Sequence, residues 1–330
     1  MKRAVGLIVV SVVAAALAGC GGDDGGDGAA EVLAQIELEG IPADVEAADD
    51  AVWVADTGSG GGLVKLDPSS LEEIGLLPVP EGAEAVGIGD STVWALSRTF
   101  GDVFAFDREA TEGDGETIDI GEGAPDPVYG EAFEDLAASG DTAYANGSLG
   151  LVGVTADGEV LEPTDAEPTD EFDTSSELEF SETPVVTASD TVWAMTADGV
   201  RDFDLETLEP LDDLGSSAEA LAVGDDEVWA VADDGVITRL VSGDDDEEIA
   251  NLEERFAGED PEAIAYAGGD LWVVGAGQLL RIDPESGEEI GDTLSLPDGT
   301  DELGYSISAG APDDSVVIIQ RPTGMVWRVG

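Results

Sequence analysis

The stretch Val52-Trp53-Val54-Ala55 decides the fold, because a similar short strand returns six more times at intervals of about 36 to 50 residues. The later copies are Val93-Trp94-Ala95-Leu96, Ala143-Tyr144-Ala145-Asn146, Val192-Trp193-Ala194-Met195, Val228-Trp229-Ala230-Val231, Leu271-Trp272-Val273-Val274 and Val317-Ile318-Ile319-Gln320. Five of the six tryptophans of the chain occupy this slot. A repeat of this length, built from short β-rich segments, is typical of a propeller.

Each repeat contains four candidate strands. In the first repeat we expect them at residues 44–48, 51–55, 63–66 and 74–79, with turns rich in Gly and Asp between them. Seven repeats of four strands predict an all-β fold, a seven-bladed β-propeller with four-stranded antiparallel blades. Six or eight blades are the alternatives; six would follow if the repeat around Tyr144 were an insertion.

The two ends of the repeat array predict how the ring closes. The last repeat stops at Val326-Trp327-Arg328-Val329 after three strands, and the first is preceded by an extra apolar strand at residues 32–38. We expect this N-terminal strand to complete the last blade, because an open sheet edge would otherwise remain. The propeller should therefore be a single domain over residues 31–330.

The charge of the chain is extreme. It contains 76 acidic residues against 11 basic ones and no histidine, for a formal net charge of -65. Such a charge repels itself in ordinary buffer, whereas molar salt shortens the Debye length to about 3 Å. We expect a surface adapted to high salt; the alternative is that it collects cations or basic partners. A nucleic-acid partner is excluded because phosphate binding needs a basic footprint.

The first 19 residues have the pattern of an export signal. The basic start Met1-Lys2-Arg3 precedes an uncharged run at residues 4–18, which is short for a membrane-spanning helix. The run ends in Leu17-Ala18-Gly19-Cys20, which resembles the lipobox of bacterial lipoproteins. The resemblance implies that Cys20 is acylated and anchors an extracytoplasmic protein to the cell membrane; a plain secretory signal is the alternative. Residues 20–30, rich in Gly and Asp, should form a flexible tether.

The repeat motif also resembles a known group of propellers. Residues 51–56, Ala-Val-Trp-Val-Ala-Asp, together with 64–68, Val-Lys-Leu-Asp-Pro, are similar to the YVTN and streptogramin-lyase-like superfamily, common among exported bacterial proteins. The resemblance spans about residues 31–330 and implies the propeller fold rather than a particular activity. Streptogramin-lyase-like enzymes use a histidine as acid or base, so that activity is not expected in a chain without one.

Acidic residues recur where the innermost strand of each blade should begin. Glu84, Glu134, Glu219 and Glu262 stand ten residues before the repeat aromatic, and Asp44 and Asp135 occupy the next position in their repeats. These carboxylates could ring one mouth of the central channel. Calcium takes six to eight oxygen ligands, so the pattern suggests calcium as a possible cofactor. The alternative is chance, because about a quarter of the chain is acidic.

Other polar residues follow the second strand of their repeats and should open on the same face. They are Arg98, Asn146 and Arg321. Arginine is scarce in this chain, and a pair on one face could clamp a carboxylate or a phosphate. The alternative is that each arginine pairs with a nearby acid, such as Asp102 or Asp313.

The residue types exclude several kinds of enzyme. Without histidine there is no Ser-His-Asp or Cys-His set and no imidazole ligand for a metal. We expect a monomeric binding or scaffolding module whose ligand is a protein or a small molecule. One alternative is a calcium-dependent lactone or ester hydrolase built from Glu84, Glu134, Asn146 and Glu219. Another is a protein that recruits partners in envelope assembly.

Overall fold

A computed structural model describes residues 29–58, 60–97, 102–120, 133–147, 150–161, 184–196, 199–213, 217–225, 227–242, 246–253, 255–256, 260–296, 304–321 and 323–330. The predictions for Cys20, Arg98 and the acidic stretch 162–182 fall outside these residues. The described part contains no helix that is long and apolar enough to cross a membrane.

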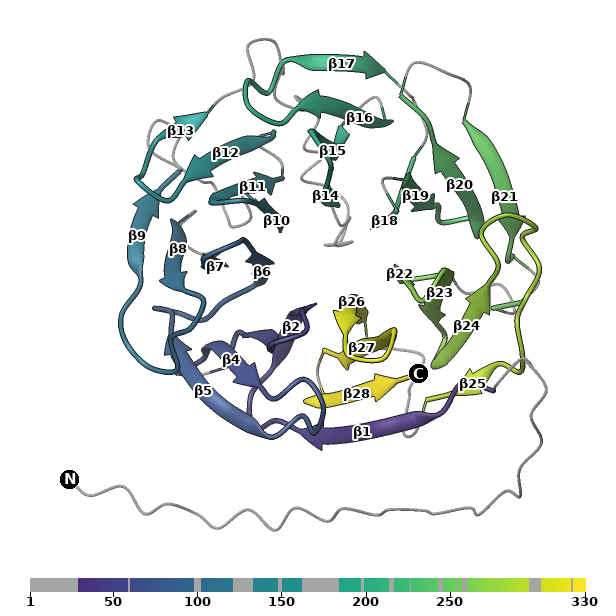
Figure 1. Cartoon of the computed structure of the whole chain (residues 1–330), viewed down its shortest axis with the longest axis horizontal. Helices are drawn as coiled ribbons and strands as arrows, with labels where there is room; N and C mark the ends of the chain where they lie inside the picture. The colour runs from purple at the N-terminus through teal and green to yellow at the C-terminus, as the bar shows by residue number, and fades with distance from the viewer. Residues whose placement is uncertain are drawn as a thin grey trace, which may run out of the picture.

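The described strands form seven four-stranded antiparallel sheets arranged as a ring (Figure 1). Blade 1 contains β2 (Pro42–Ala47), β3 (Val52–Asp56), β4 (Gly62–Leu66) and β5 (Glu73–Pro78). Blade 2 contains β6 (Ala85–Ile88), β7 (Thr92–Ser97), β8 (Asp102–Asp107) and β9 (Glu116–Asp119). Blade 3 contains β10 (Asp135–Ser139), β11 (Thr142–Asn146), β12 (Val152–Thr155) and β13 (Val160–Leu161). Blade 4 contains β14 (Val185–Ala188), β15 (Thr191–Thr196), β16 (Gly199–Asp204) and β17 (Pro210–Asp213).

The remaining three blades follow the same order from the axis outward. Blade 5 contains β18 (Ala220–Gly224), β19 (Glu227–Val231), β20 (Val236–Leu240) and β21 (Glu247–Asn251). Blade 6 contains β22 (Ala263–Ala267), β23 (Asp270–Gly275), β24 (Gln278–Ile282) and β25 (Leu294–Ser295). Blade 7 contains β26 (Tyr305–Ala311), β27 (Ser315–Gln320), β28 (Met325–Val329) and, at its outer edge, β1 (Val32–Glu37). The prediction of seven blades is confirmed.

The N-terminal strand closes the ring, as predicted. β1 runs antiparallel to β28, with Val32 opposite Val329 and Glu37 opposite Met325. The inward side chains of β1, Ala34 and Ile36, pack against the core between blades 7 and 1. The last blade therefore gains its fourth strand, and the edge of β28 is covered.

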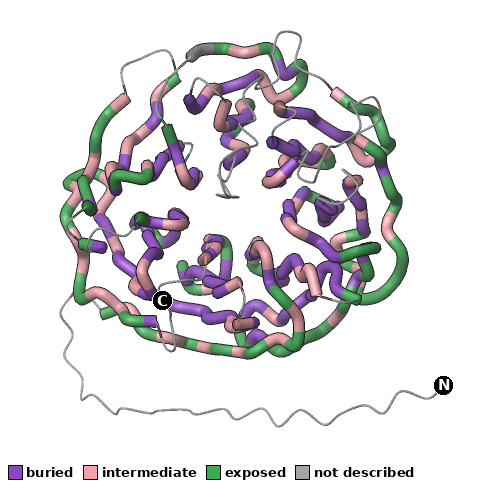
Figure 2. The backbone as a smooth tube through the Cα atoms, turned by 180° about the vertical axis from the view of Figure 1, so that it is seen from behind, coloured by how far each residue is buried: buried purple, intermediate pink, exposed green. Residues whose placement is uncertain are grey.

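The hydrophobic core lies between neighbouring blades, and the repeat aromatic is its largest component. Trp53 of blade 1 is fully buried in one cluster with Val86 and Phe104 of blade 2. The same arrangement places Trp272 of blade 6 in one cluster with Trp327 of blade 7. Figure 2 shows the buried positions concentrated on the inner strands, with exposed positions along the outer edge. The period of the sequence thus reports packing between blades.

Scarce basic residues stand opposite the repeat tryptophan on the third strand of several blades. Lys65 pairs with Trp53, and its ammonium lies 4.7 Å from the centre of the indole ring and donates to the carbonyl of Arg108 in blade 2. Arg281 pairs with Trp272 in the same way, with its guanidinium 5.4 Å from the ring centre. These cations cover indole faces and join structural elements.

Candidate functional site

A cavity with two connected chambers lies on the axis of the ring. It is lined by the innermost strands β2, β6, β10, β14, β18, β22 and β26, which surround the axis (Figure 1). The outer chamber, of about 600 Å³, is lined by the residues at which these strands begin. The second chamber, of about 240 Å³, lies further along the same strands, is the more open of the two, and shares Glu46, Val185 and Leu221 with the outer one; we call it the inner chamber. The outer volume falls within the range of small-molecule pockets, about 300–1,000 Å³, and the inner volume lies slightly below it.

The four predicted glutamates occupy equivalent positions at the start of their blades. The backbone N–H of each donates to a carbonyl at the end of the neighbouring second strand: Glu84 to Leu96, Glu134 to Asn146, Glu219 to Val231 and Glu262 to Val274. Glu84, Glu134 and Glu219 line the outer chamber. The carboxylate of Glu262 accepts a hydrogen bond of 2.8 Å from the backbone N–H of Tyr305, the first residue of β26. The structure therefore places three of these four residues at the mouth.

Asp44 and Asp135 also line the outer chamber, and both tie neighbouring blades together. Asp44 accepts hydrogen bonds from the N–H of Val86 at 3.0 Å and from the hydroxyl of Ser306 at 2.8 Å. Asp135 accepts from the N–H of Val185 at 2.9 Å. Burial raises the pKa of Asp44, although these hydrogen bonds oppose the shift. Both carboxylates thus stabilise the arrangement of the innermost strands.

The acids at the mouth do not converge on one point. Within the described residues, no three acidic side chains are placed so that they could hold one metal ion. A calcium site needs several oxygen ligands at 2.3–2.6 Å from a common centre. The described carboxylates therefore give the calcium hypothesis, and the hydrolase that depends on it, no geometric support.

The two remaining predicted residues that the structure describes have different surroundings. Arg321 lines the outer chamber, where its positive charge favours ionised Asp44 and acts to lower the pKa of that carboxyl. Asn146 is buried, and its amide donates a hydrogen bond of 2.9 Å to the carbonyl of Met195 in blade 4. Arg321 therefore belongs to the mouth, whereas Asn146 joins two blades.

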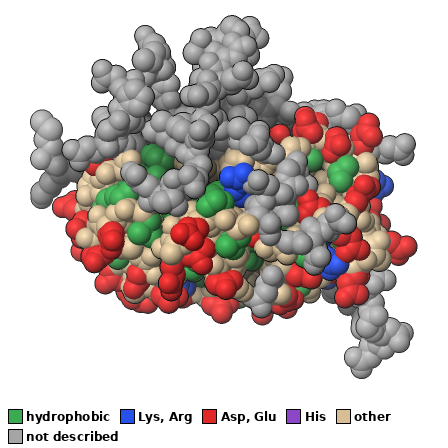
Figure 3. All heavy atoms as spheres, turned by 90° about the horizontal axis from the view of Figure 1, so that it is seen from above, with side chains coloured by type: hydrophobic (Ala, Val, Ile, Leu, Met, Phe, Trp, Pro, Cys, Tyr) green, Lys and Arg blue, Asp and Glu red, His purple; other side chains and the backbone are tan. Residues whose placement is uncertain are grey.

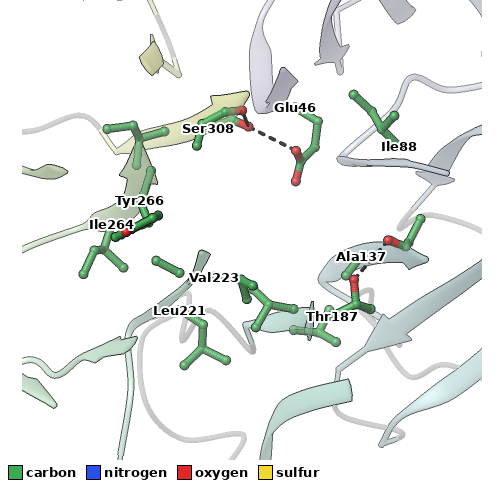
Figure 4. Close-up of a pocket in the computed structure, with 16 residues that line it drawn as sticks. Glu46, Ile88, Ala137, Thr187, Leu221, Val223, Ile264, Tyr266 and Ser308 are labelled. Atoms are coloured by element: carbon green, nitrogen blue, oxygen red, sulfur yellow. Dashed lines mark hydrogen bonds between the residues drawn. The ribbon is translucent and has the colours of Figure 1, made fainter. Parts of the chain in front are cut away.

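The residue that the sequence reasoning missed is Glu46, on β2. Its carboxylate faces the cavity, where Figure 4 shows it directed into the open centre of the inner chamber. The hydroxyl of Ser308 donates to it at 3.0 Å. Burial among protein atoms raises the pKa of Glu46 to about 8, and the negative charges of Asp44 and Asp135 act in the same direction. Glu46 is therefore a carboxyl group that changes its charge near neutral pH.

A sequence signal for Glu46 did exist. In blade 1 it pairs with Trp53, and the residues that pair with the repeat position in the other blades are all uncharged. They are Gly87, Ala137, Val186, Ala222, Ala265 and Ile307. Reading the residue seven positions before each aromatic of the first six repeats would have shown a glutamate where the other five have glycine, alanine or valine.

The geometry defines a seven-bladed β-propeller with a cavity on its axis. A scan against protein-family models finds no match, and a search of curated protein sequences finds none either. Similar solved structures include the propeller domain of Cps50 (Swd1) from Myceliophteria thermophila, with a TM-score of 0.67, 13% identity, and coverage of 91% of this chain and 99% of that chain. The WD40 propeller domain of Doa1 has a TM-score of 0.65, 13% identity and coverages of 91% and 97%. BamB from Moraxella catarrhalis has a TM-score of 0.56, 13% identity and coverages of 92% and 98%. At these identities the likeness shows the fold alone.

Proposed function

We propose that this protein is an extracytoplasmic binding module anchored to the cell membrane, which takes a protein or small-molecule ligand at the mouth of its axial cavity. The observation that carries the proposal is the cavity itself, with a charged mouth and a second chamber whose side chains are mainly aliphatic. Sites that bind ligands combine apolar walls with a few placed polar groups in this way. The ring of hydrogen-bonded blades supplies a rigid frame for such a site.

The mouth also offers an apolar contact. Ile41, just before β2, lines the outer chamber with 51% of its surface exposed. Ile74 on the outer strand β5 is comparably exposed, at 44%, but lies away from the cavity. The two isoleucines form a matched pair for a binding experiment.

A photo-reactive phenylalanine analogue placed at either position tests the proposal. Irradiation of cells grown in their normal salt should give one defined adduct from the Ile41 variant and none from the Ile74 variant. Adducts of equal yield at both sites, or none at either, would contradict binding at the mouth. A partner that belongs to envelope assembly would be recognised as the second component of the adduct.

The anchor is supported by the sequence Leu17-Ala18-Gly19-Cys20, with acylation at Cys20. The described chain begins next to β1, the outermost strand of blade 7, so an anchored tether would join the ring at its outer edge. A Cys20→Ser variant should move from the membrane fraction to the soluble fraction; a wild-type protein found already soluble would contradict the anchor.

The adaptation to high salt is supported by the charge of -65 and by its distribution. Figure 3 shows acidic side chains spread across the described surface on the side in view, with few basic ones among them. Thermal unfolding followed by far-UV circular dichroism should give a clearly higher Tm in 2 M than in 0.1 M sodium chloride, because salt screens the repulsion. Equal values would contradict the adaptation.

Membership in the YVTN and streptogramin-lyase-like superfamily is part of the same proposal. It is supported by the repeated Val-Trp strand and by the Leu66-Asp67-Pro68 exit from β4, which Ile282-Asp283-Pro284 repeats after β24. In both copies the aspartate carboxylate accepts hydrogen bonds from two following backbone N–H groups, which fixes the turn into the outer part of the blade.

A further inference from the structure

The inner chamber is lined by a belt of uncharged residues interrupted by one carboxylate. Ala137, Val186, Ala222, Ala265 and Ile307, which occupy the position of Glu46 in their own blades, all line this chamber. Leu221, Val223 and Ile264 lie across the chamber from the Glu46 carboxylate (Figure 4). A buried charge inserted into an apolar belt costs free energy unless a partner compensates it.

The protein itself compensates this charge poorly. Among the described residues, the hydroxyl of Ser308 is the one donor to the Glu46 carboxylate, although a carboxylate has about four acceptor sites. The same Ser308 hydroxyl also lies 3.1 Å from the carbonyl of Ala309, which competes for its single proton. The charged groups that act on Glu46 are Asp44 of its own strand and Asp135 of β10, and both repel an ionised carboxylate. Arg321, which lines the outer chamber, acts on Asp44.

We propose that the axial cavity binds a small organic cation that carries an apolar group, with Glu46 as its counterion and the apolar belt as the wall against which the rest of the molecule packs. This inference rests on the proposed binding site at the cavity and names the ligand class. The positive charge of the ligand neutralises the carboxylate of Glu46, and the apolar part of the ligand occupies the space lined by Leu221 and Ile264. An inorganic cation satisfies only the first requirement.

A high salt concentration favours a ligand that makes both an ionic and an apolar contact. Exposed ion pairs are screened in molar salt, whereas a pair with the partly buried Glu46 is screened less. Apolar contacts do not weaken in salt. A ligand that combines both contacts can therefore be selected over sodium ions present at far higher concentration.

Benzyltrimethylammonium is a suitable probe, because its charge is fixed at every pH and its ring is apolar. Its affinity should be measured by isothermal titration calorimetry in 2 M sodium chloride at pH 6.5 and pH 9. With a pKa of about 8, Glu46 is almost fully protonated at the lower pH and largely ionised at the higher. We expect binding at least tenfold tighter at pH 9, because the apparent Kd scales inversely with the competent fraction. At pH 7 binding should release a proton, detected as a dependence of the heat on the ionisation enthalpy of the buffer.

Two variants sharpen the test. Glu46→Gln keeps the shape and the Ser308 contact but cannot ionise, so it should bind the probe at least tenfold more weakly at pH 9 and show no pH dependence. Glu72→Gln removes one exposed carboxylate from the same blade and should behave as wild type. Neopentylbenzene, the uncharged isostere in which carbon replaces the ammonium nitrogen, should show no pH dependence in any variant.

Three results would overturn the inference. They are failure of the wild type to bind the probe at pH 9, equal affinity at both pH values, and equal affinity of wild type and Glu46→Gln. The pH profile of the wild type alone suffices if the variant fails to fold. A specific adduct at Ile41 together with absence of probe binding would refute the cation and leave the binding module intact. Probe binding without an adduct would support a small-molecule ligand and contradict a protein partner at the mouth.

Discussion

Replacing Glu46 by glutamine should change how the stability of the protein depends on pH. The pKa of this carboxyl rises from 4.5 to about 8 on folding. Between these values the folded protein holds a proton that the unfolded chain releases, so stability is highest at low pH and is lost as pH rises through this window. Above about pH 8 both states are ionised and the loss is complete. Glutamine has no proton to release, so the variant should lack this contribution.

The magnitude follows from the size of the shift. Each pKa unit is worth about 1.4 kcal/mol, so the rise from 4.5 to about 8 amounts to about 5 kcal/mol, of which about 3.5 kcal/mol is lost above pH 5.5. For a domain of this size about 3.5 kcal/mol corresponds to about 6 °C in Tm, because the unfolding entropy is about 2 cal/mol/K per residue.

Differential scanning calorimetry from pH 5.5 to 9.5 in 2 M sodium chloride measures this effect. Asp44, whose pKa is also raised, contributes a loss of its own as pH rises, so the informative quantity is the difference between wild type and Glu46→Gln. The glutamine variant should gain on wild type by about 6 °C between pH 5.5 and 9. Glu72→Gln should run parallel to wild type. Parallel curves for wild type and Glu46→Gln would refute the reasoning.

Three further predictions concern the frame. Removing β1 should lower Tm by about 10 °C or more and promote aggregation, because the edge of β28 is then exposed. A synthetic peptide with the sequence of β1 should restore part of the lost Tm. An unchanged Tm, in a melt in which light scattering monitors aggregation, would contradict the closure. Gly224→Ala would place a Cβ in steric clash with the ring of Tyr266, which stacks on Trp229. The free energy of unfolding in urea should fall by about 1–3 kcal/mol, and the aromatic signal in near-UV dichroism should weaken. If stability and signal are both unchanged, this packing is wrong. Arg328→Met would remove a buried guanidinium that donates to the hydroxyl of Ser315 and to the carbonyls of Ser69 and Pro312, and should cost about 1–3 kcal/mol in the same assay; a neutral result would show that these hydrogen bonds do not stabilise the blade.

The blade register could be predicted because one residue type repeats in one structural role. Every copy of the Trp53 motif lies on the second strand of its blade, and each tryptophan fills the space towards a neighbouring blade. The closing strand was predictable for a related reason, since a three-stranded last repeat leaves an edge that only the extra N-terminal strand can cover. The outermost strands were less predictable: β13 and β25 have two residues each and pair weakly against solvent.

The chemistry of the cavity was harder to predict because it depends on single exceptions. Glu84 and Glu134 were found by comparing equivalent positions in each repeat and looking for the same residue type. Glu46 escapes such a comparison because it differs from all its counterparts. The same comparison treated Glu262 as equivalent to Glu84, but it could not show that a backbone N–H of the next blade takes up its carboxylate. A shift of register between Pro42 and Asp44 further changes which side chains of β2 face the axis.

The closure by β1 also sets the order of events in folding. The strand made first must wait for the strands made last, because β1 pairs with β28 across nearly the whole length of the chain. A contact of such sequence separation forms slowly, since the loop entropy is lost before the contact stabilises anything. The six earlier blades consist of consecutive strands and can form as the chain emerges. Completion of the ring should therefore be the last and rate-limiting step of folding. Until then β28 and β1 each present an unpaired edge to the surroundings.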